Sequence, residues 1–160
     1  MIELQTIGPD DWKLWRELRL AALTEAPYAF GSRLADWADA PEERWRERLG
    51  VPSAYQVIAS LDGTPVGMAG GFRAEEPEVT ELVSMWIAPA GRGHGAGDAL
   101  MTAIEDWARG IGARVLKLSV VDGNEPAHNL YLRSGFADTD ELGDLMPDGV
   151  RREIVMSRPL

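Results

Sequence analysis

The sequence has no cysteine and only two histidines, and these absences exclude several kinds of site. Without cysteine the chain forms no disulfide, has no thiolate nucleophile and offers no sulfur ligand to a metal. His94 and His128 lie far apart in the chain, so we expect no zinc site and no metal cofactor. The lack of cysteine is typical of a cytoplasmic protein, and we expect that location.

Basic residues are scarce relative to acidic ones, with 16 Lys and Arg against 26 Asp and Glu and a formal net charge of −10. This balance argues against a nucleic-acid partner, whose phosphates need a basic surface. It favours solubility, and it also suits cationic partners such as amines. No apolar run approaches the roughly 20 residues that span a bilayer, so we expect no membrane partner. The N-terminus lacks the basic and apolar regions of a signal peptide.

The length of 160 residues suits one domain with a full-sized core. No internal repeat, linker or low-complexity tract divides the chain. We therefore expect residues 1–160 to form a single domain.

Hydrophobic periodicity predicts the first elements. A strand is expected at 1–7 and a helix near 11–24, which Asp10 or Asp11 would cap. The apolar face of that helix, at positions i, i+4, i+7 and i+8, would carry Leu14, Leu18, Ala21 and Ala22.

An irregular loop is expected next, over residues 25–40. A short helix then follows Pro41, with Trp45 and Leu49 one turn apart. Asp62-Gly63 between two apolar runs is a strong hairpin signal, and a second hairpin should lead into the strand 78–88.

The second half of the chain alternates helices and strands. A helix should follow residue 97, then a strand at 115–121, a helix near 125–133 and a short strand from Phe136. The acidic segment 138–149 is expected to be a loop, followed by a last strand near 151–158.

These elements predict an α/β fold with the order βααβββαβαββ. The helix after residue 97 is the crossover of a βαβ unit, so the strands on either side of it should be parallel neighbours. We expect a mixed sheet of about seven strands, flanked on both faces by about four helices.

A glycine-rich run, Arg92-Gly93-His94-Gly95-Ala96-Gly97, joins the apolar strand to the amphipathic helix. Glycines at a strand-to-helix junction expose backbone N–H groups, and the helix dipole adds partial positive charge, so the run is suited to phosphate. Glycines also form ordinary tight turns. A second element about thirty residues on, Asn124 to Tyr131 followed by Gly135-Phe136, favours the phosphate interpretation.

Together the two elements resemble the GNAT-type N-acetyltransferase superfamily. Its loop, Gln/Arg-x-x-Gly-x-Gly/Ala, is matched by residues 92–97, and the strand before it ends in a small apolar run and a proline, as at residues 86–89. Its later element, Asn-x-x-Ala-x-x-x-Tyr and then Gly-Phe, is matched by Asn124, Ala127, Tyr131, Gly135 and Phe136. The order of elements agrees over nearly the whole chain.

The resemblance implies acetyl-coenzyme A as the acetyl donor. Its pyrophosphate would lie on the loop amides, with Arg92 near the phosphates and His94 at a position that the family leaves free. The residues expected at this donor are Trp86, Ile87, Ala88, Arg92, Gly93, His94, Gly95, Ala96, Gly97, Asn124 and Tyr131. Trp86, Ile87 and Ala88 would act through their backbone, in a strand that splays from its neighbour. Asn124 would contact the pantetheine arm, cap the helix that begins at Glu125, or do both.

The resemblance also implies a catalytic tyrosine. Tyr131 would protonate the thiolate leaving group, and its ordinary pKa of about 10 lies near that of a thiol, about 8.5. Glu81 is our candidate for the base, because a carboxylate in an apolar strand is costly without a purpose. Period-two alternation groups Glu81 with Val83, Met85 and Ile87. Alternatively Glu81 is a solvated strand end, Ser84 orients a water, or there is no fixed base.

The acceptor is expected to be an amine on a small molecule or a peptide. The residues that bind the acceptor would come from the segment between the first two helices, with candidates Tyr28, Phe30, Arg33 and Trp37. Alternatively, these side chains pack the loop against the core. The segment 138–149 either closes over the acceptor or is solvated. Homodimers are frequent in the family, so a homodimer is possible.

Two other functions fit parts of the pattern. A non-catalytic acyl-coenzyme A-binding module would keep the glycine run without transferring the acyl group. The pattern Gly91-x-Gly93-x-x-Ala96 also satisfies a dinucleotide-binding fingerprint. That fingerprint needs an acidic residue at the end of the next strand, and here no carboxylate appears before Asp122.

Overall fold

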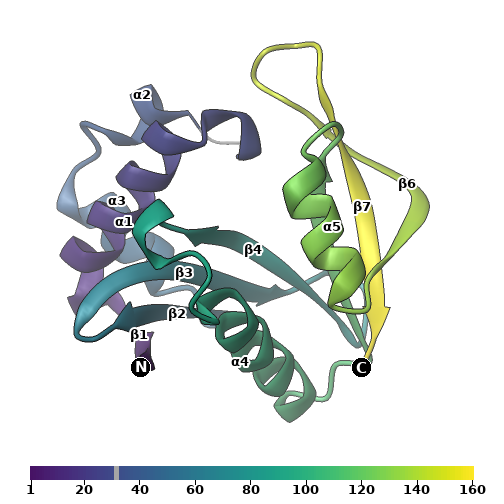
Figure 1. Ribbon diagram of the computed structural model, residues 1–160, viewed down its shortest axis with the longest axis horizontal. Helices are drawn as coiled ribbons and strands as arrows, with labels where there is room; N and C mark the ends of the chain where they lie inside the picture. The colour runs from purple at the N-terminus through teal and green to yellow at the C-terminus, as the bar shows by residue number, and fades with distance from the viewer. Residues whose placement is uncertain (31–32) are drawn as a thin grey trace.

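A computed structural model describes residues 1–30 and 33–160 (Figure 1). Over that range the chain forms seven strands, five α-helices and three 3₁₀ turns. The strands are β1 (Ile2–Ile7), β2 (Ala54–Leu61), β3 (Thr64–Arg73), β4 (Val79–Ile87), β5 (Val115–Val121), β6 (Ala137–Leu145) and β7 (Arg152–Pro159). The helices are α1 (Trp12–Glu25), α2 (Leu34–Trp37), α3 (Glu42–Leu49), α4 (Ala96–Gly110) and α5 (Glu125–Arg133), and the turns are η1 (Pro9–Asp11), η2 (Pro27–Ala29) and η3 (Pro89–Gly91).

All seven strands form one sheet in the order β1-β2-β3-β4-β5-β7-β6. Neighbouring strands are antiparallel except β4 and β5, which are parallel and are joined through α4. The expected mixed sheet and its βαβ crossover are therefore confirmed.

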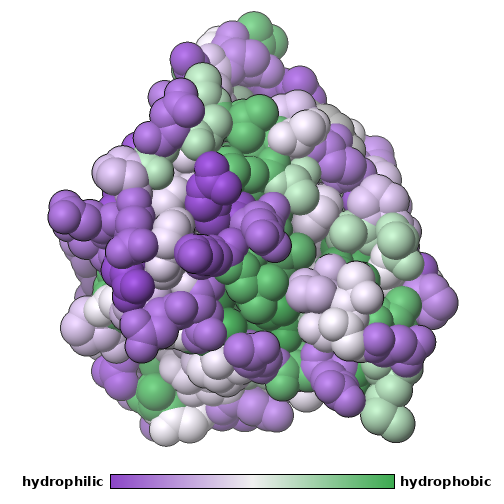
Figure 2. Space-filling model, turned by 90° about the vertical axis from the view of Figure 1, so that its left-hand side faces the viewer, coloured by the Kyte–Doolittle hydropathy of each residue, from purple (hydrophilic) through white to green (hydrophobic). Residues whose placement is uncertain are grey.

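The sheet separates two apolar cores. The first, the α1-side core, packs α1 and α3 on the sheet and includes Trp15, Trp45 and Met68. The second, the α4-side core, packs α4 and α5 on the sheet and includes Leu100, Ile104 and Leu118. Figure 1 shows α1, α2 and α3 gathered apart from α4 and α5, and Figure 2 shows an apolar area between hydrophilic side chains on the face beside the first group.

Several local predictions are confirmed. Asp62 and Gly63 both have positive φ, +50° and +86°, as a tight turn between antiparallel strands requires. The strand expected at 115–121 and the helix expected near 125–133 are β5 and α5.

Two predictions about irregular segments are wrong. Residues 34–37, expected within a loop, form the single turn α2, which makes five helices instead of four. Most of the segment 138–149 belongs to β6 and is not a loop. β6 is an edge strand with mostly exposed side chains and a shifted register against β7, so the sequence shows no apolar alternation there.

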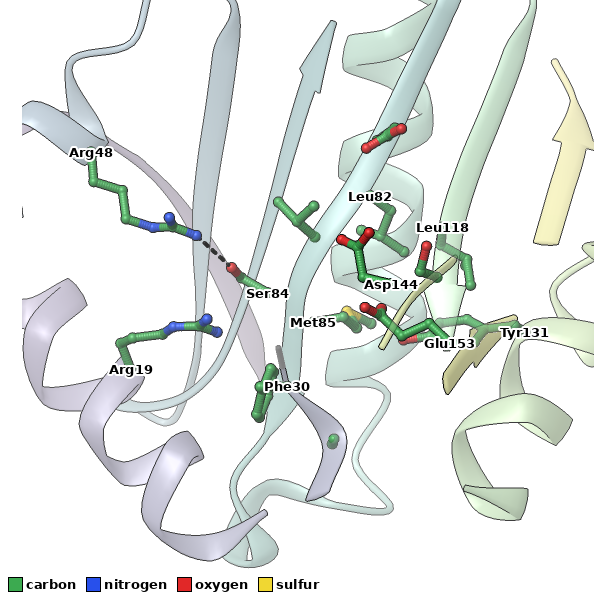
Figure 3. Close-up of a pocket in the computed structure, with 14 residues that line it drawn as sticks. Arg19, Phe30, Arg48, Leu82, Ser84, Met85, Leu118, Tyr131, Asp144 and Glu153 are labelled. Atoms are coloured by element: carbon green, nitrogen blue, oxygen red, sulfur yellow. Dashed lines mark hydrogen bonds between the residues drawn. The ribbon is translucent and has the colours of Figure 1, made fainter. Parts of the chain in front are cut away.

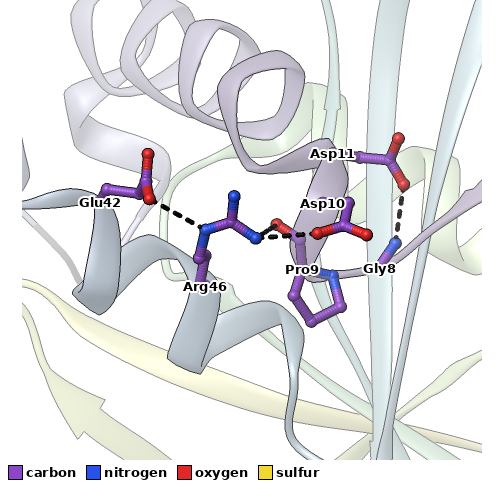
Figure 4. A network of polar contacts seen from close by, with 6 residues as sticks. All are labelled: Gly8, Pro9, Asp10, Asp11, Glu42 and Arg46. Atoms are coloured by element: carbon purple, nitrogen blue, oxygen red, sulfur yellow. Dashed lines mark hydrogen bonds and ion pairs between the residues drawn. The ribbon is translucent and has the colours of Figure 1, made fainter.

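Asp11 is the N-cap residue of α1, as predicted, but its side chain makes no capping hydrogen bond to the helix. The carboxylate of Asp11 instead accepts the N–H of Gly8 at 3.0 Å, as Figure 4 shows. Asp10 accepts a hydrogen bond from Arg46 at 2.9 Å, and Arg46 also binds Glu42 at 3.2 Å. These contacts join the start of α1 to α3.

A close packing contact at Gly71 of β3 provides a test of the α4-side packing. A Cβ atom there would lie 2.6 Å from Cζ3 of Trp107, and the Trp107 ring stacks on Tyr55 with centroids 5.5 Å apart. We expect Gly71→Ala to lower the free energy of unfolding by about 1–3 kcal/mol, because the added methyl group would displace the Trp107 ring, which also stacks on Tyr55. Urea denaturation measures the change.

Gly110→Ala is the matched control, because no atom lies within 4 Å of the added methyl group. We expect it to be neutral or slightly stabilising. Equal stability of the two variants would contradict the close packing at Gly71.

Candidate active site

The parallel pair β4 and β5 separates part of the way along its length. Only three residue pairs join the strands, of which the last is Glu81 with Lys117. β4 continues to Ile87 and β5 to Val121, so the two strands diverge beyond that pair. The divergence, which the family resemblance implied, opens a gap in the middle of the sheet.

A β-bulge at Ser84 lies beside this gap. Ser84 has φ +57°, and the register with β3 shifts between the pairs Met68–Trp86 and Gly70–Val83. In a regular strand Leu82 and Trp86 would share a face, yet Leu82 belongs to the α4-side core and Trp86 to the α1-side core. The bulge therefore reverses the two faces of β4.

This reversal corrects the predicted grouping of Glu81 with Met85 and Ile87. Met85 and Ile87 pack against the α4-side core, as Leu82 does. Glu81, next to Leu82, points to the opposite face, where α1 and α3 lie. The prediction failed because it assumed an unbroken period of two.

A cavity of about 280 Å³ occupies the gap (Figure 3). Both predicted catalytic residues, Glu81 and Tyr131, line it. The other lining residues come from α1, α3, the segment after α1, and strands β4 to β7: Arg19, Ala29, Phe30, Arg48, Leu82, Val83, Ser84, Met85, Leu118, Ser119, Asp144 and Glu153.

Tyr131 reaches the cavity from α5. Its ring packs edge-on against Phe136, with centroids 6.1 Å apart, and only 8% of the residue is exposed. Burial raises the pKa of Tyr131 to about 12, because the apolar surroundings disfavour the phenolate. The hydroxyl therefore stays protonated at neutral pH, and its pKa lies further from that of a thiol, about 8.5, than the ordinary tyrosine value does.

The carboxylates of the cavity also have altered proton affinity. Burial raises the pKa of Glu81, and the charge of Lys117 opposes that shift. Burial likewise raises the pKa of Glu153 on β7, with Asp144 and Glu81 adding repulsion. A carboxylate with a raised pKa is a better base than an ordinary one. Among residues 1–30 and 33–160, no group of three or more His, Asp or Glu side chains is arranged to hold a metal.

The glycine run forms an open loop at the start of α4. Gly93 and Gly95 have φ of +82° and +84°, which other residues rarely adopt. Gly95 is the N-cap of α4 and has no side chain to occupy the first N–H groups of the helix. Gly97 lies in the first turn, where a Cβ atom would meet only Met85 at 3.9 Å. His94 is exposed on the same loop.

Arg92 joins this loop to its surroundings. Its Nη2 donates to Glu25 at 2.8 Å, and its Nε donates to the carbonyl of Ile87 at 3.1 Å. The indole N–H of Trp86 also donates to Glu25, at 3.0 Å. The hydrogen bond from Trp86 is the largest cause of a lowered pKa at Glu25, and the bond from Arg92 lowers this pKa further. Arg92 therefore connects α1, β4 and the glycine loop.

The backbone groups expected to meet pantetheine differ in their availability. The N–H of Ala88 donates to Val66 at 2.7 Å, and its carbonyl accepts from Gly91 at 2.8 Å. Ala88 therefore points its N–H at β3. Because successive residues of a strand alternate, the N–H of Ile87 points to the gap. The Trp86 side chain faces the α1-side core and not the gap.

The remaining predicted residues lie around this centre. The side-chain oxygen of Asn124 accepts the N–H of Ala127 at 3.5 Å, so Asn124 is the N-cap of α5. Phe30 is buried and lines the cavity, whereas Trp37 packs on Trp45 with centroids 4.8 Å apart. Arg33 donates to the carbonyl of Pro147 at 3.1 Å, which links the segment before α2 to the β6–β7 turn. The side chain of Tyr28 lies outside the described residues.

Four charged residues of the cavity were not predicted: Arg19, Arg48, Asp144 and Glu153. Arg19 was missed because the apolar face of α1 was assigned to Leu14 and Ala21. The buried positions are in fact Trp15, Leu18, Arg19, Ala22 and Leu23, and Ala21 is exposed. An arginine four residues after Trp15, with Leu23 four residues further on, was the available signal.

The mixed sheet thus opens beside a glycine loop and a buried tyrosine, a class of site in which a loop and a helix N-terminus offer backbone N–H groups to an anionic ligand. Comparison with known proteins identifies the class more closely. The model of the Acetyltransferase (GNAT) family matches residues 12–136. The chain therefore belongs to the GNAT acetyltransferase family.

Individual relatives agree with this assignment. An IAA acetyltransferase from Azospirillum brasilense is 32% identical over 71% of this chain and 73% of its own length. A mycothiol acetyltransferase from Renibacterium salmoninarum is 30% identical over 87% of this chain, which spans only 41% of that relative. The solved structure of a GCN5-related N-acetyltransferase from Kribbella flavida has the same fold, with a TM-score of 0.78 and 24% identity over 99% of this chain and 98% of that one.

Burial of Glu81 predicts a pH-dependent change in stability. A raised pKa means that the folded chain binds the proton more tightly than the unfolded chain does, so ionised Glu81 destabilises the fold above its folded pKa. We expect Glu81→Gln to raise the melting temperature at pH 7.5, and this gain should disappear as the pH falls towards 4. Thermal denaturation over that range measures it.

Glu75→Gln is the control, because Glu75 is exposed and makes no ion pair with the described residues. It should change the melting temperature little at either pH. A Glu81→Gln variant that is less stable at pH 7.5 than the unmodified chain would contradict the burial argument.

Proposed function

We propose that this chain transfers an acetyl group from acetyl-coenzyme A to a primary amine, as a single domain over residues 1–160. The observation that carries the proposal is the buried hydroxyl-bearing side chain of Tyr131 in the gap between β4 and β5, one helix away from an open glycine loop. The family and the names of its relatives support acetyl transfer.

The glycine loop is proposed to bind the pyrophosphate of the donor. Gly93 and Gly95 give the loop its shape, and the first N–H groups of α4 with the helix dipole attract phosphate oxygens. Arg92, which is half exposed, would add positive charge near the phosphates. The pantetheine arm would run through the gap past Ile87 and towards Asn124.

The acetyl group would then lie near Tyr131. The N–H of Ile87 is the donor that points to the gap, and it would stabilise the oxyanion that forms when the amine attacks the thioester carbonyl. Tyr131 would protonate the departing thiolate, and Glu81 would take a proton from the amine, directly or through a water. Without cysteine there is no thiol to carry the acetyl group, so we propose direct attack in a ternary complex.

Other functions have less support. A non-catalytic acyl-coenzyme A-binding module is not favoured by the relatives, which are named as acetyltransferases. No α-helix in residues 1–30 and 33–160 is long and apolar enough to cross a membrane. The cytoplasmic location and the homodimer stay predictions.

Replacing the tyrosine hydroxyl tests the proposed acid. We expect Tyr131→Phe to lower kcat by about 10²-fold or more, because a positioned acid contributes that much to proton transfer. The affinity for acetyl-coenzyme A should change little, since the ring and its packing remain. Thiol release with a panel of amines measures kcat, and calorimetry measures donor binding.

Tyr55→Phe is the matched control, because the Tyr55 hydroxyl contacts Thr6 at 3.2 Å and lies outside the cavity. Unchanged turnover in Tyr131→Phe would remove Tyr131 from the mechanism. A chain that binds neither acetyl-coenzyme A nor coenzyme A would refute the proposed function as a whole.

A charge placed at the start of α4 tests the donor site. A carboxylate near a helix N-terminus stabilises the helix, so Gly97→Asp should fold normally, but it should repel the donor phosphates. We expect the Kd for coenzyme A to rise about tenfold or more, with a smaller rise at high salt. Gln5→Glu adds the same charge on the edge strand β1 as the control. Equal affinity in the two variants would place the phosphates elsewhere.

A further inference from the structure

The cavity between β4 and β5 has charges of opposite sign on its two sides. Arg19 of α1 and Arg48 of α3 lie on one side, and Asp144 of β6 and Glu153 of β7 lie on the other, as Figure 3 shows. Glu81 of β4 also lines the cavity. A ligand that fits this arrangement has an anionic end and a cationic end.

The arginine side lacks a counter-charge. Arg19 is only 5% exposed, and neither Arg19 nor Arg48 makes an ion pair with a carboxylate in the described part of the chain. The Nη1 atom of Arg19 and the Nε atom of Arg48 are buried and have no hydrogen-bond acceptor there. Because both side chains line the cavity, an anion that enters it would supply the missing counter-charge.

The two guanidinium groups also disfavour each other. Burial and then the charge of Arg48 lower the pKa of Arg19 to about 10. Arg19 lies over the Phe30 ring at 4.8 Å, which stabilises the cation only in part. Burying a charge without a partner is costly, so a buried Arg19 beside a half-buried Arg48 is poorly explained by stability alone.

The geometry of the arginine side suits an oxyanion. Arg48 donates through Nη2 to the hydroxyl of Ser84 at 3.5 Å, which holds its guanidinium against the bulge of β4. Guanidinium groups present parallel N–H donors that match the two oxygens of a carboxylate or a phosphate. A carboxylate or phosphate between Arg19 and Arg48 would satisfy the buried donors and neutralise both charges.

The acidic side suits the amine of the same molecule. Glu81 lies at the last pair of β4 and β5, where the gap begins, and Glu153 shares the cavity with Tyr131. An ammonium group there would be attracted by the carboxylates and would lie beside the proposed base. Glu81 would take one proton from the ammonium group, and the free amine would attack the acetyl carbonyl carbon to form the C–N bond. As the C–S bond breaks, Tyr131 would donate its proton to the departing sulfur, and the second proton of the nitrogen would pass to the tyrosinate and restore it.

We propose that the acceptor is a zwitterion, an amine that carries a carboxylate or phosphate group which Arg19 and Arg48 bind. This inference rests on the proposed function and names its substrate class. Arg19 and Arg48 are thus specificity-determining residues, and purely cationic amines should be poor acceptors.

The test compares matched acceptors in the thiol-release assay with acetyl-coenzyme A. The panel contains small, aromatic and long-chain amino acids, the carboxamide of each, and aminoalkyl phosphates with their alcohols. We expect at least one acid or phosphate to exceed its neutral partner in kcat/KM by about 10-fold to 100-fold, the range for a charge-assisted hydrogen bond. The carboxylate and phosphate arms identify which anion is preferred.

The variants Arg19→Gln and Arg48→Gln should lose this preference, through a higher KM for the acids and phosphates. Arg44→Gln is the matched control, because Arg44 is exposed on the same helix as Arg48 and does not line the cavity. It should keep the preference of the unmodified chain.

A melting curve separates ligand recognition from a structural role. Arg19→Met removes a buried charge, so its melting temperature without acceptor should equal or exceed that of the unmodified chain. A large fall in melting temperature, with equal loss of activity for every acceptor, would overturn the inference.

Two further outcomes would also overturn it, provided that coenzyme A binds. One is neutral amines that react as well as their acidic partners, and the other is a panel in which no zwitterion is acetylated. Failure to bind coenzyme A would instead refute the proposed function, so the two failures are distinguishable.

Discussion

The divergence of β4 from β5 is the constraint on which the whole site depends. A regular parallel pair would use the backbone groups of both strands along their length, and a ligand would find no unpaired N–H between them. Here the pairing ends at Glu81 and Lys117, although β4 continues for six more residues to Ile87. The gap therefore separates the backbone edges of β4 and β5 beyond that pair, and side chains of β4 to β7 and α5 line it, which a regular parallel pair would not provide.

The bulge at Ser84 decides which side chains meet in that gap. A serine at positive φ costs roughly 1–3 kcal/mol, so the surrounding packing must hold it. The reversal of faces places Trp86 under α1, where Glu25 joins it to Arg92, and turns Met85 towards the side where Tyr131 lies. One backbone irregularity thus places two neighbouring side chains of β4 in different apolar cores and leaves Met85 at the cavity.

The sequence predicted the features that depend on neighbouring residues and missed those that depend on distant ones. Neighbouring residues in the sequence determine the glycine loop, the bounds of β5 and α5, and the turn at Asp62-Gly63. The burial of Arg19 is not, because an arginine counts as polar in any amphipathic pattern and only the packing of α3 and Phe30 buries it. The bulge at Ser84 was not predicted for a similar reason, because the pattern of an apolar strand does not show a bulge until its neighbouring strands are known.

The titratable groups of the cavity share one physical property. Burial disfavours the charged form of Arg19, Glu81, Glu153 and Tyr131, whatever the sign of the charge. A partner of opposite charge would therefore offset the cost of burying Arg19, Glu81 or Glu153, whereas Tyr131 is stable as the neutral phenol. Without such a partner, the two apolar cores must offset the desolvation that lowers the stability of the folded chain.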